Sequence, residues 1–212
     1  MKILENLNFV AVDFETANHL RTSACSIGLA VVEKGKVVET LHRLIRPIPF
    51  SFYPGNIAIH GITPRMVERE PEFDRLWTEL KPYFEGRQIV AHNASFDLSV
   101  LRALFDHFGI PYPSLHYFCT VMAAKRIIKD SFNHKLSTLS QYFDIELNHH
   151  NAESDAIAAA YIAIGLCRKT GSNTLDELSE FIEYKLGKFE MNTVDKFAAI
   201  KKSTKKTKTK VE

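Results

Sequence analysis

Two carboxylates lie two residues apart at the end of an apolar segment. Asp13 and Glu15 follow Phe9-Val10-Ala11-Val12 directly, with only Phe14 between them. On a strand, side chains two residues apart point to the same face, so the two acids would lie side by side. Like charges at that distance repel each other unless a cation lies between them. The pair therefore indicates a metal site or, alternatively, an exposed strand end where acids are harmless.

Two aspartates stand near the start of expected helices. Asp97 lies in the first turn of a helix expected over 95–108, and Asp155 opens an alanine-rich helix expected over 152–167. The helical face through Asp155 continues with apolar residues, so this acid should point inward, where it needs a partner. Both aspartates could instead only stabilise the helix N-terminus that they occupy.

A histidine pair, His149-His150, precedes Asp155 by a few residues. If the four carboxylates converge beside a histidine, their oxygen donors favour Mg²⁺ or Mn²⁺ over zinc. Two such ions about 4 Å apart form a site for phosphoryl displacement. The histidine would then accept the proton of the attacking water, because its pKa lies near neutral pH. For any single histidine, a surface or capping role is the alternative.

The expected secondary structure places these residues at the ends of elements. The N-terminal third predicts a strand over 9–15 and a hairpin over 26–45, and thus an antiparallel meander. Strands and helices alternate after Pro49. The predicted fold class is α/β, with a mixed five-stranded sheet flanked by helices. The other expected elements are helices from Thr63-Pro64, over 73–84, from Thr120 to about Ile128, over 136–143 and from Thr174, and strands over 88–92 and 116–120.

Composition and charge indicate a soluble globular protein. The chain has 212 residues with a net charge of +2, yet six of its 27 basic residues and one of its 25 acids lie in 201–212, so the remainder carries −3. We expect that lysine-rich tail to be disordered. Its lysines could add nonspecific affinity for a nucleic-acid backbone or could only solubilise the chain. The three cysteines are scattered along the chain, which favours reduced thiols in a cytoplasmic protein. The chain has no long apolar run and no signal-peptide pattern at its start, so we expect no membrane association.

Three segments together resemble the motifs of the DEDDh 3′-5′ exonucleases. They are Phe9 to Thr16, Ile89 to Asp97, and His150 to Ala156, in which the histidine precedes the aspartate by five residues. The segment Ile59 to Thr63 matches a further feature of this family. The family is the DnaQ-like group, which includes the proofreading subunit of the bacterial replicative polymerase. The resemblance covers roughly residues 7–168 and implies a ribonuclease H-like fold.

This resemblance implies roles for particular residues. Asp13, Glu15, Asp97 and Asp155 match the ligands of two divalent ions, Mg²⁺ or Mn²⁺, and His150 matches the general base. The implied reaction is hydrolysis from the 3′ end of mainly single-stranded DNA, which releases nucleoside 5′-monophosphates. The implied organisation is an exonuclease domain over 1–170, a C-terminal helical extension over 171–200 and the tail over 201–212. The residues that match nucleotide-binding positions are Phe14, Thr16, Ile59, His60, Asn93 and Phe96.

Other functions share the same residues. An RNA-directed 3′-5′ exonuclease, such as an oligoribonuclease or an RNA-trimming enzyme, has the same five catalytic positions, and contacts to the 2′-hydroxyl decide between RNA and DNA. A non-catalytic, polymerase-associated binding module is the alternative from another class. The segment after Gly171 contains no glutamine, which disfavours a clamp-binding peptide. Association with a polymerase, the oligomeric state and the choice of metal are left open by the sequence.

Overall fold

The protein is described here by a computed structural model that covers residues 4–191 and 196–200. The tail over 201–212, expected to be disordered, lies outside these described residues. A six-stranded sheet with the strand order β3-β2-β1-β4-β5-β7 forms the centre of the fold. β1 runs parallel to β4, and β4 runs parallel to β5, while the other neighbours are antiparallel. The strands are β1 Phe9–Thr16, β2 Ala24–Glu33, β3 Lys36–Leu44, β4 Gln88–Ala91, β5 Leu115–Cys119 and β7 Gly187–Phe189.

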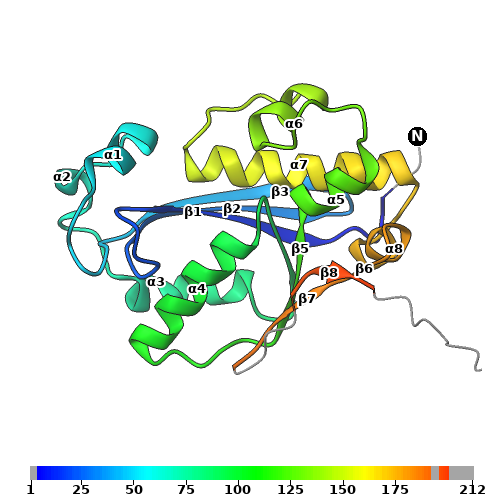
Figure 1. The fold of residues 1–212 in the computed structure, drawn as a ribbon. Helices are drawn as coiled ribbons and strands as arrows, with labels where there is room; N and C mark the ends of the chain where they lie inside the picture. The colour runs from blue at the N-terminus through cyan, green and yellow to red at the C-terminus, as the bar shows by residue number, and fades with distance from the viewer. Residues whose placement is uncertain (1–3, 192–195, 201–212) are drawn as a thin grey trace, which may run out of the picture.

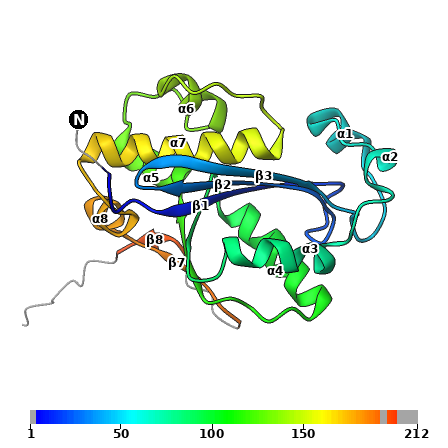
Figure 2. The same cartoon turned by 180° about the vertical axis from the view of Figure 1, so that it is seen from behind.

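Helices cover both faces of this sheet. α5, α6 and α7 lie on one face, and α3 and α4 lie on the other (Figure 1). α1 and α2 project from one end of the sheet, whereas α8 lies near the opposite end (Figures 1 and 2). The helices are α1 Pro54–His60, α2 Pro64–Val67, α3 Phe73–Leu80, α4 Ser95–Phe108, α5 Thr120–Ile127, α6 Leu136–Tyr142, α7 Ala152–Thr170 and α8 Leu175–Phe181.

The apolar side chains of β1 explain its central position in the sheet. The apolar residues of Phe9–Val12 are buried, because β1 lies between β2 and β4 in the centre of the sheet. A central strand covered on both faces needs apolar residues on both. Hydrophilic side chains can therefore appear on β1 only at its carboxyl end, where Asp13 and Glu15 lie. The predicted strand, the hairpin of β2 and β3, and the α/β fold class are confirmed.

Residues at the helix ends also agree with the positions of several predicted helices. Thr63 precedes Pro64 at the start of α2, Gly109 ends α4 with φ 64°, and Thr174 accepts a hydrogen bond from Glu177 N at the start of α8. The helix expected over 73–84 is shorter, since a 3₁₀ turn, Lys81–Tyr83, follows α3. Pro82 at the second position of that turn has no amide hydrogen to continue an α-helix. No helix among the described residues is long and apolar enough to cross a membrane.

The sheet has one strand more than predicted. The segment 171–200, expected to be a helical extension, begins with α8 but continues as strands. β7 pairs antiparallel with β5, where Phe189 is buried and its ring stacks on Tyr112 with centroids 5.1 Å apart. β6, Tyr184–Lys185, and β8, Ala198–Ala199, form a separate two-stranded sheet. These strands are so short that their pairing with distant segments, and not their own sequence, determines them.

Candidate active site

Three carboxylates from two elements converge. Asp13 and Glu15 come from the carboxyl end of β1, and Asp155 comes from the first turn of α7. Each offers a carboxylate oxygen, and these oxygens lie within 4.8 Å of one another. A divalent cation binds several oxygen ligands at such spacing, and oxygen-only donors suit Mg²⁺, Mn²⁺ or Ca²⁺ better than zinc. The donor set therefore fits a divalent metal centre.

Asp97 reaches the same site from the opposite face of the sheet. It lies in the first turn of α4, and only 1% of its surface is exposed. One carboxylate oxygen accepts a hydrogen bond of 3.1 Å from the backbone amide of Phe14, the residue between Asp13 and Glu15. This bond ties the start of α4 to β1. The structure thus brings together all four carboxylates that the sequence singled out.

The carboxylates raise one another's pKa. Burial first, and then the charges of Asp97, Asp155 and Glu15, hold the pKa of Asp13 well above its usual range. Burial and the charges of Asp155 and Asp97 raise the pKa of Glu15 to about 8. Burial also raises the pKa of Asp155, although the charge of His149 partly opposes this. A bound cation would reverse this effect, because it favours the ionised form of every carboxylate around it.

This repulsion should appear as a pH-dependent stability of the metal-free protein. The pKa of Glu15 in the folded protein is about 8, whereas the unfolded chain loses that proton near the ordinary glutamate pKa of 4.5. The folded state therefore binds more protons between these values, and stability falls as the pH rises. Since Glu15 is partly exposed, we expect a loss of about 2 kcal/mol, or about 4–8 °C in Tm.

Thermal melts in EDTA between pH 5 and 8.5 check this expectation. The Glu15→Gln variant should show a shallower decline than the wild-type chain, because it has no proton to lose at this position. Added Mg²⁺ should flatten the wild-type curve. Parallel Tm curves for the two proteins in EDTA would contradict the repulsion.

The start of α7 is held in place by its own side chains. Asn151 accepts a hydrogen bond from Ser154 N and caps the helix. The carboxylate of Asp155 accepts from His150 N at 3.1 Å, and His149 Nδ1 lies 3.1 Å from the same oxygen. The rings of the two histidines stack with centroids 3.8 Å apart. Both histidines therefore border the carboxylates, and with Asp155 they form a second set of three side chains close enough together to hold a metal ion.

Gly28 allows α7 to approach the sheet. It lies on β2 directly across from Asp13, and a Cβ atom built on it would stand 2.1 Å from the backbone carbonyl carbon of Ala152. The obstacle is the helix backbone itself, which cannot rotate aside as a side chain could. Gly28 thereby sets the distance between the end of α7 that carries Asp155 and the strand that carries Asp13.

We expect Gly28→Ala to displace this end of α7, with a stability loss of about 2–4 kcal/mol and a large loss of any activity that needs the carboxylate cluster. Thermal melts and activity assays measure the two effects. Gly55→Ala is the matched control for stability, because its added Cβ would meet only the exposed ring of Tyr53 at 2.7 Å. Equal Tm values for the two variants would show that the close approach at Gly28 is not needed.

A cavity of about 630 Å³ opens over the carboxylates. Its wall includes Asp13, Glu15 and Asp155 together with both stacked histidines. Of the residues that the sequence assigned to nucleotide binding, Phe14 and Asn93 line this cavity. The other four predicted nucleotide-binding residues lie outside the wall of this cavity: Thr16, Ile59, His60 and Phe96.

His60 fastens α1 to β1. Its Nδ1 accepts a hydrogen bond from Ile62 N, so its Nε2 can carry the proton and donate to the carbonyl of Thr16, 3.2 Å away. Burial lowers the pKa of His60, which favours this neutral form. Asn56 donates to the same carbonyl at 2.7 Å. The neighbouring Ile59 is 55% exposed, so its side chain is available to a ligand while that of His60 is engaged.

Asn93 and Phe96 lie at the connection between β4 and α4. Asn93 adopts a left-handed backbone with φ 64°, a conformation that asparagine tolerates better than most residues. Phe96 is half-buried, and the guanidinium of Arg21 lies 4.4 Å from the centroid of its ring. Burial raises the pKa of Asp97 to about 7, and the positive charge of Arg21 partly opposes this shift. The loop after β1 thus brings a cation toward the carboxylates.

Sequence reasoning missed one wall of the cavity. Its members come from α5, from the start of α6 and from the connection between them. The available signal was the cluster of lysines around 125–135, which was not linked to the site because no motif includes it. His92, which follows β4, also lines the cavity, and burial lowers its pKa to about 4. The missed residues are His92, Val121, Lys125, Asn133, His134, Lys135 and Leu136.

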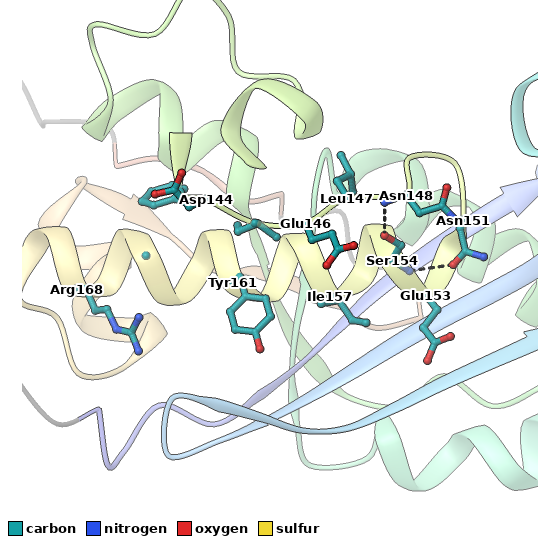
Figure 3. A pocket seen from close by; sticks show the side chains of 13 residues that line it. Asp144, Glu146, Leu147, Asn148, Asn151, Glu153, Ser154, Ile157, Tyr161 and Arg168 are labelled. Atoms are coloured by element: carbon teal, nitrogen blue, oxygen red, sulfur yellow. Dashed lines mark hydrogen bonds between the residues drawn. The ribbon is translucent and has the colours of Figure 1, made fainter. Parts of the chain in front are cut away.

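A second cavity, of about 680 Å³, lies along the outer side of α7 (Figure 3). The connection from Asp144 to Asn148 forms one wall, and Tyr161 and Arg168 of α7 line it farther along (Figure 3). Glu146 and Glu153 add negative charge. None of the four clustered carboxylates lines this cavity, so it is separate from the cavity over the carboxylates, although its volume is slightly larger.

Comparison with known proteins agrees with this geometry. The family described as "Exonuclease", RNase_T, matches residues 10–163. The chain belongs to this family. Membership of the exonuclease family implies the use of divalent metal ions, and the carboxylate cluster supplies donors of the right kind. The matched range contains β1, α4 and the start of α7, and therefore all four carboxylates.

Among curated relatives, a PolC-type DNA polymerase III from Caldanaerobacter subterraneus subsp. tengcongensis is 28% identical over 176 residues, which are 81% of this chain and 12% of that protein. The 3′-5′ exonuclease DinG of Staphylococcus haemolyticus is 28% identical over 82% of this chain and 19% of its own length. The chain therefore spans less than a fifth of either relative.

Solved structures agree on the fold. Exonuclease X in complex with 5′ overhanging duplex DNA is 26% identical, with a TM-score of 0.66 over 82% of this chain and 99% of that one. The nuclease domain of 3′hExo, a DEDDh family member bound to rAMP, has a TM-score of 0.67 at 16% identity over 78% of this chain and 94% of that one. The resemblance to DEDDh exonucleases and the ribonuclease H-like fold class are confirmed.

Proposed function

We propose that the protein is a metal-dependent 3′-5′ exonuclease that removes nucleotides from the 3′ end of mainly single-stranded DNA. The observation that carries this proposal is the convergence of Asp13, Glu15 and Asp155, with oxygens within 4.8 Å, beside a histidine pair at one cavity. A structural role gives no reason to gather four acids, of which Asp97 and Asp155 are buried, where their charges raise one another's pKa. Membership of the exonuclease family supports the same conclusion.

Asp13, Glu15, Asp97 and Asp155 would hold two divalent ions, Mg²⁺ or Mn²⁺. Such ions, when bound, supply positive charge at the scissile phosphate and lower the pKa of a water molecule there. The buried carboxylates fix their own positions in advance, through the bonds from Phe14 N to Asp97 and from His150 N to Asp155. This pre-organisation reduces the cost of assembling the site.

His150 takes the proton in the proposed reaction. The oxygen of water forms a bond to the terminal phosphorus as the bond from phosphorus to the 3′-oxygen of the preceding nucleotide breaks. The water proton goes to the imidazole, and the departing 3′-oxygen gains a proton from solvent. The products are a nucleoside 5′-monophosphate and a strand with a new 3′-hydroxyl. Burial and the charge of His149 lower the pKa of His150, so the ring is neutral and able to accept a proton at pH 7.

The terminal nucleotide would lie against groups that do not read base identity. Phe14 and Asn93 line the cavity, and the exposed Ile59 lies on α1, which His60 fastens to Thr16. Apolar and aromatic side chains pack against any base, so we expect little base preference. The ring of Phe96, which the guanidinium of Arg21 approaches to 4.4 Å, would add a further contact to this nucleotide.

Cleavage of 5′-labelled single-stranded DNA and RNA of one sequence, with Mg²⁺ or with EDTA, tests the proposal. We expect both strands to stay intact in EDTA and DNA to be shortened faster than RNA in Mg²⁺. Faster shortening of RNA would assign the protein to RNA turnover. Intact strands in Mg²⁺ and in Mn²⁺ would contradict an exonuclease and favour a binding module.

A further inference from the structure

The connection between α5 and α6 carries an aromatic side chain that the proposed reaction does not use. Phe132 is 98% exposed, more than any other large apolar side chain among the described residues. A ring in this position contributes nothing to the core. Phe132 is not itself part of the cavity wall, but the three residues that follow it, Asn133 to Lys135, are, which distinguishes it from an isolated apolar residue on the surface.

The connection is braced on both sides of Phe132. His134 Nε2 lies 2.8 Å from the carbonyl of Ile128, and Ser131 Oγ donates to the carbonyl of Asn133 at 2.5 Å. Asn133 Oδ1 accepts from Lys135 N at 3.0 Å and from Thr138 Oγ1 at 2.7 Å. These bonds hold the backbone that presents the ring. A ligand that stacks on Phe132 therefore meets a surface that is largely ordered in advance.

The same connection is positively charged where it meets the cavity. Lys125 and Lys135 line the cavity that also contains the carboxylates. Residues 125–135 contain four basic side chains and one acid, Asp130, whereas residues 136–143 contain no charged residue. The rest of the chain, without the tail over 201–212, has a net negative charge. Positive charge is thus concentrated in the segment that contributes two lysines to the cavity lined by the carboxylates.

We propose that Phe132, Lys125 and Lys135 bind the substrate strand on the 5′ side of the scissile bond, with a base stacked on Phe132 and backbone phosphates against the two lysines. The inference rests on the proposed function, because it concerns the same substrate. Proteins that bind single strands without sequence preference combine a cationic groove with exposed aromatic rings. A base can stack on Phe132 only if one of its faces is free of a neighbouring base, so this contact favours a single-stranded 3′ region.

Steady-state kinetics on DNA strands of different length test the stacking contact. A dinucleotide is too short to reach far from the carboxylates, whereas a strand of about 12 nucleotides covers a full single-strand site. We expect Phe132→Ala to raise KM for the long strand roughly 5- to 100-fold with little change in kcat. The rise should shrink as the strand shortens, and Phe132→Tyr should restore a low KM.

Phe181→Ala is the matched control, because Phe181 is also an exposed phenylalanine, 62% exposed, but lies on α8 outside the cavity wall. If the wild-type protein degrades the long strand and the Phe132→Ala and Phe181→Ala variants have equal KM values on it, the stacking contact alone is overturned. A wild-type protein that degrades no strand of any length would overturn the exonuclease and this contact together. The two failures are thereby distinguished.

The lysine contacts have a separate measurement. Binding of a fluorescent single-stranded DNA in EDTA is followed by anisotropy as the salt concentration rises. Each lysine that neutralises a phosphate adds about 0.7 to the slope of log K against log salt for a single strand. Changing both Lys125 and Lys135 to Gln should therefore lower the slope by about 1.4. The control changes Lys36 and Lys188, exposed residues of β3 and β7, and an equal slope for the two double variants would overturn the phosphate contacts.

Discussion

Replacement of Asp155 by alanine is expected to lower the rate of strand cleavage at least about a thousandfold, equivalent to about 4 kcal/mol in the barrier. Asp155 is 4% exposed and supplies one of the three converging carboxylates. Its carboxylate also accepts a hydrogen bond from the backbone amide of His150, so its loss removes a proposed metal ligand and an anchor of the preceding loop. Gel analysis of a 5′-labelled strand in Mg²⁺ measures the effect.

Glu153→Gln is the matched control for Asp155→Ala. Glu153 lies in the same first turn of α7, but its carboxylate accepts from Thr40 Oγ1 at 2.6 Å and belongs to the wall of the outer cavity. We expect this variant to cleave at nearly the wild-type rate. Thermal melts in EDTA show whether Asp155→Ala remains folded. Wild-type cleavage by folded Asp155→Ala would contradict the assignment of the site.

His150→Ala should lower the rate by roughly 10²–10⁴-fold, the range expected when a general base is lost. Metal binding should persist, because the carboxylates remain. The wild-type rate should rise with pH as His150 loses its proton and become constant above its pKa. That pKa is lowered from 6.5 by burial and by His149, so the rise should be complete by about pH 7. Rate measurements from pH 5 to 8 in Mg²⁺ check this profile.

The comparison with His149→Ala distinguishes the two histidines. His149 Nδ1 lies 3.1 Å from Asp155, and the two rings stack 3.8 Å apart. Only His150 matches the spacing that the DEDDh resemblance assigns to the base. We therefore expect the smaller loss from His149→Ala, together with an unchanged shape of the pH profile. A larger loss from His149→Ala than from His150→Ala would transfer the role of base to His149.

The carboxylates could be predicted from the sequence because local patterns place each of them. Asp13 and Glu15 end an apolar strand, Asp97 follows a short strand at a helix start, and Asp155 opens a helix with an apolar face. Strand alternation and helix periodicity convert these patterns into directions in space. The structure adds the bond from Phe14 N to Asp97, which no periodicity could indicate.

Other parts of the molecule had no comparable local signal. α1 has no buried residue, so no apolar stripe marks it in the sequence. β7 has three residues, and Phe189 becomes part of the core only through packing on Tyr112 and Phe105. Lys125 and Lys135 belong to different helical regions and meet at one cavity only because the chain turns back between α5 and α6. Such contacts depend on tertiary structure, so local sequence patterns do not indicate them.

Gly28 illustrates an intermediate case. A glycine inside an apolar strand indicates a close approach of another backbone, but the sequence does not name the approaching segment. The structure identifies it as Ala152 at the start of α7. The position of α7, which carries Asp155, thus depends on a residue that itself has no reactive group.

One time course tests the polarity and the metal dependence of cleavage most directly. A 5′-labelled single-stranded DNA is incubated with the protein in Mg²⁺, next to the same strand with a blocked 3′ end, and the released products are identified. The account predicts a ladder that shortens by single nucleotides from the 3′ end, release of nucleoside 5′-monophosphates, and protection by the block and by EDTA. Cuts inside the strand, shortening from the 5′ end, or unchanged strands in both Mg²⁺ and Mn²⁺ would contradict it.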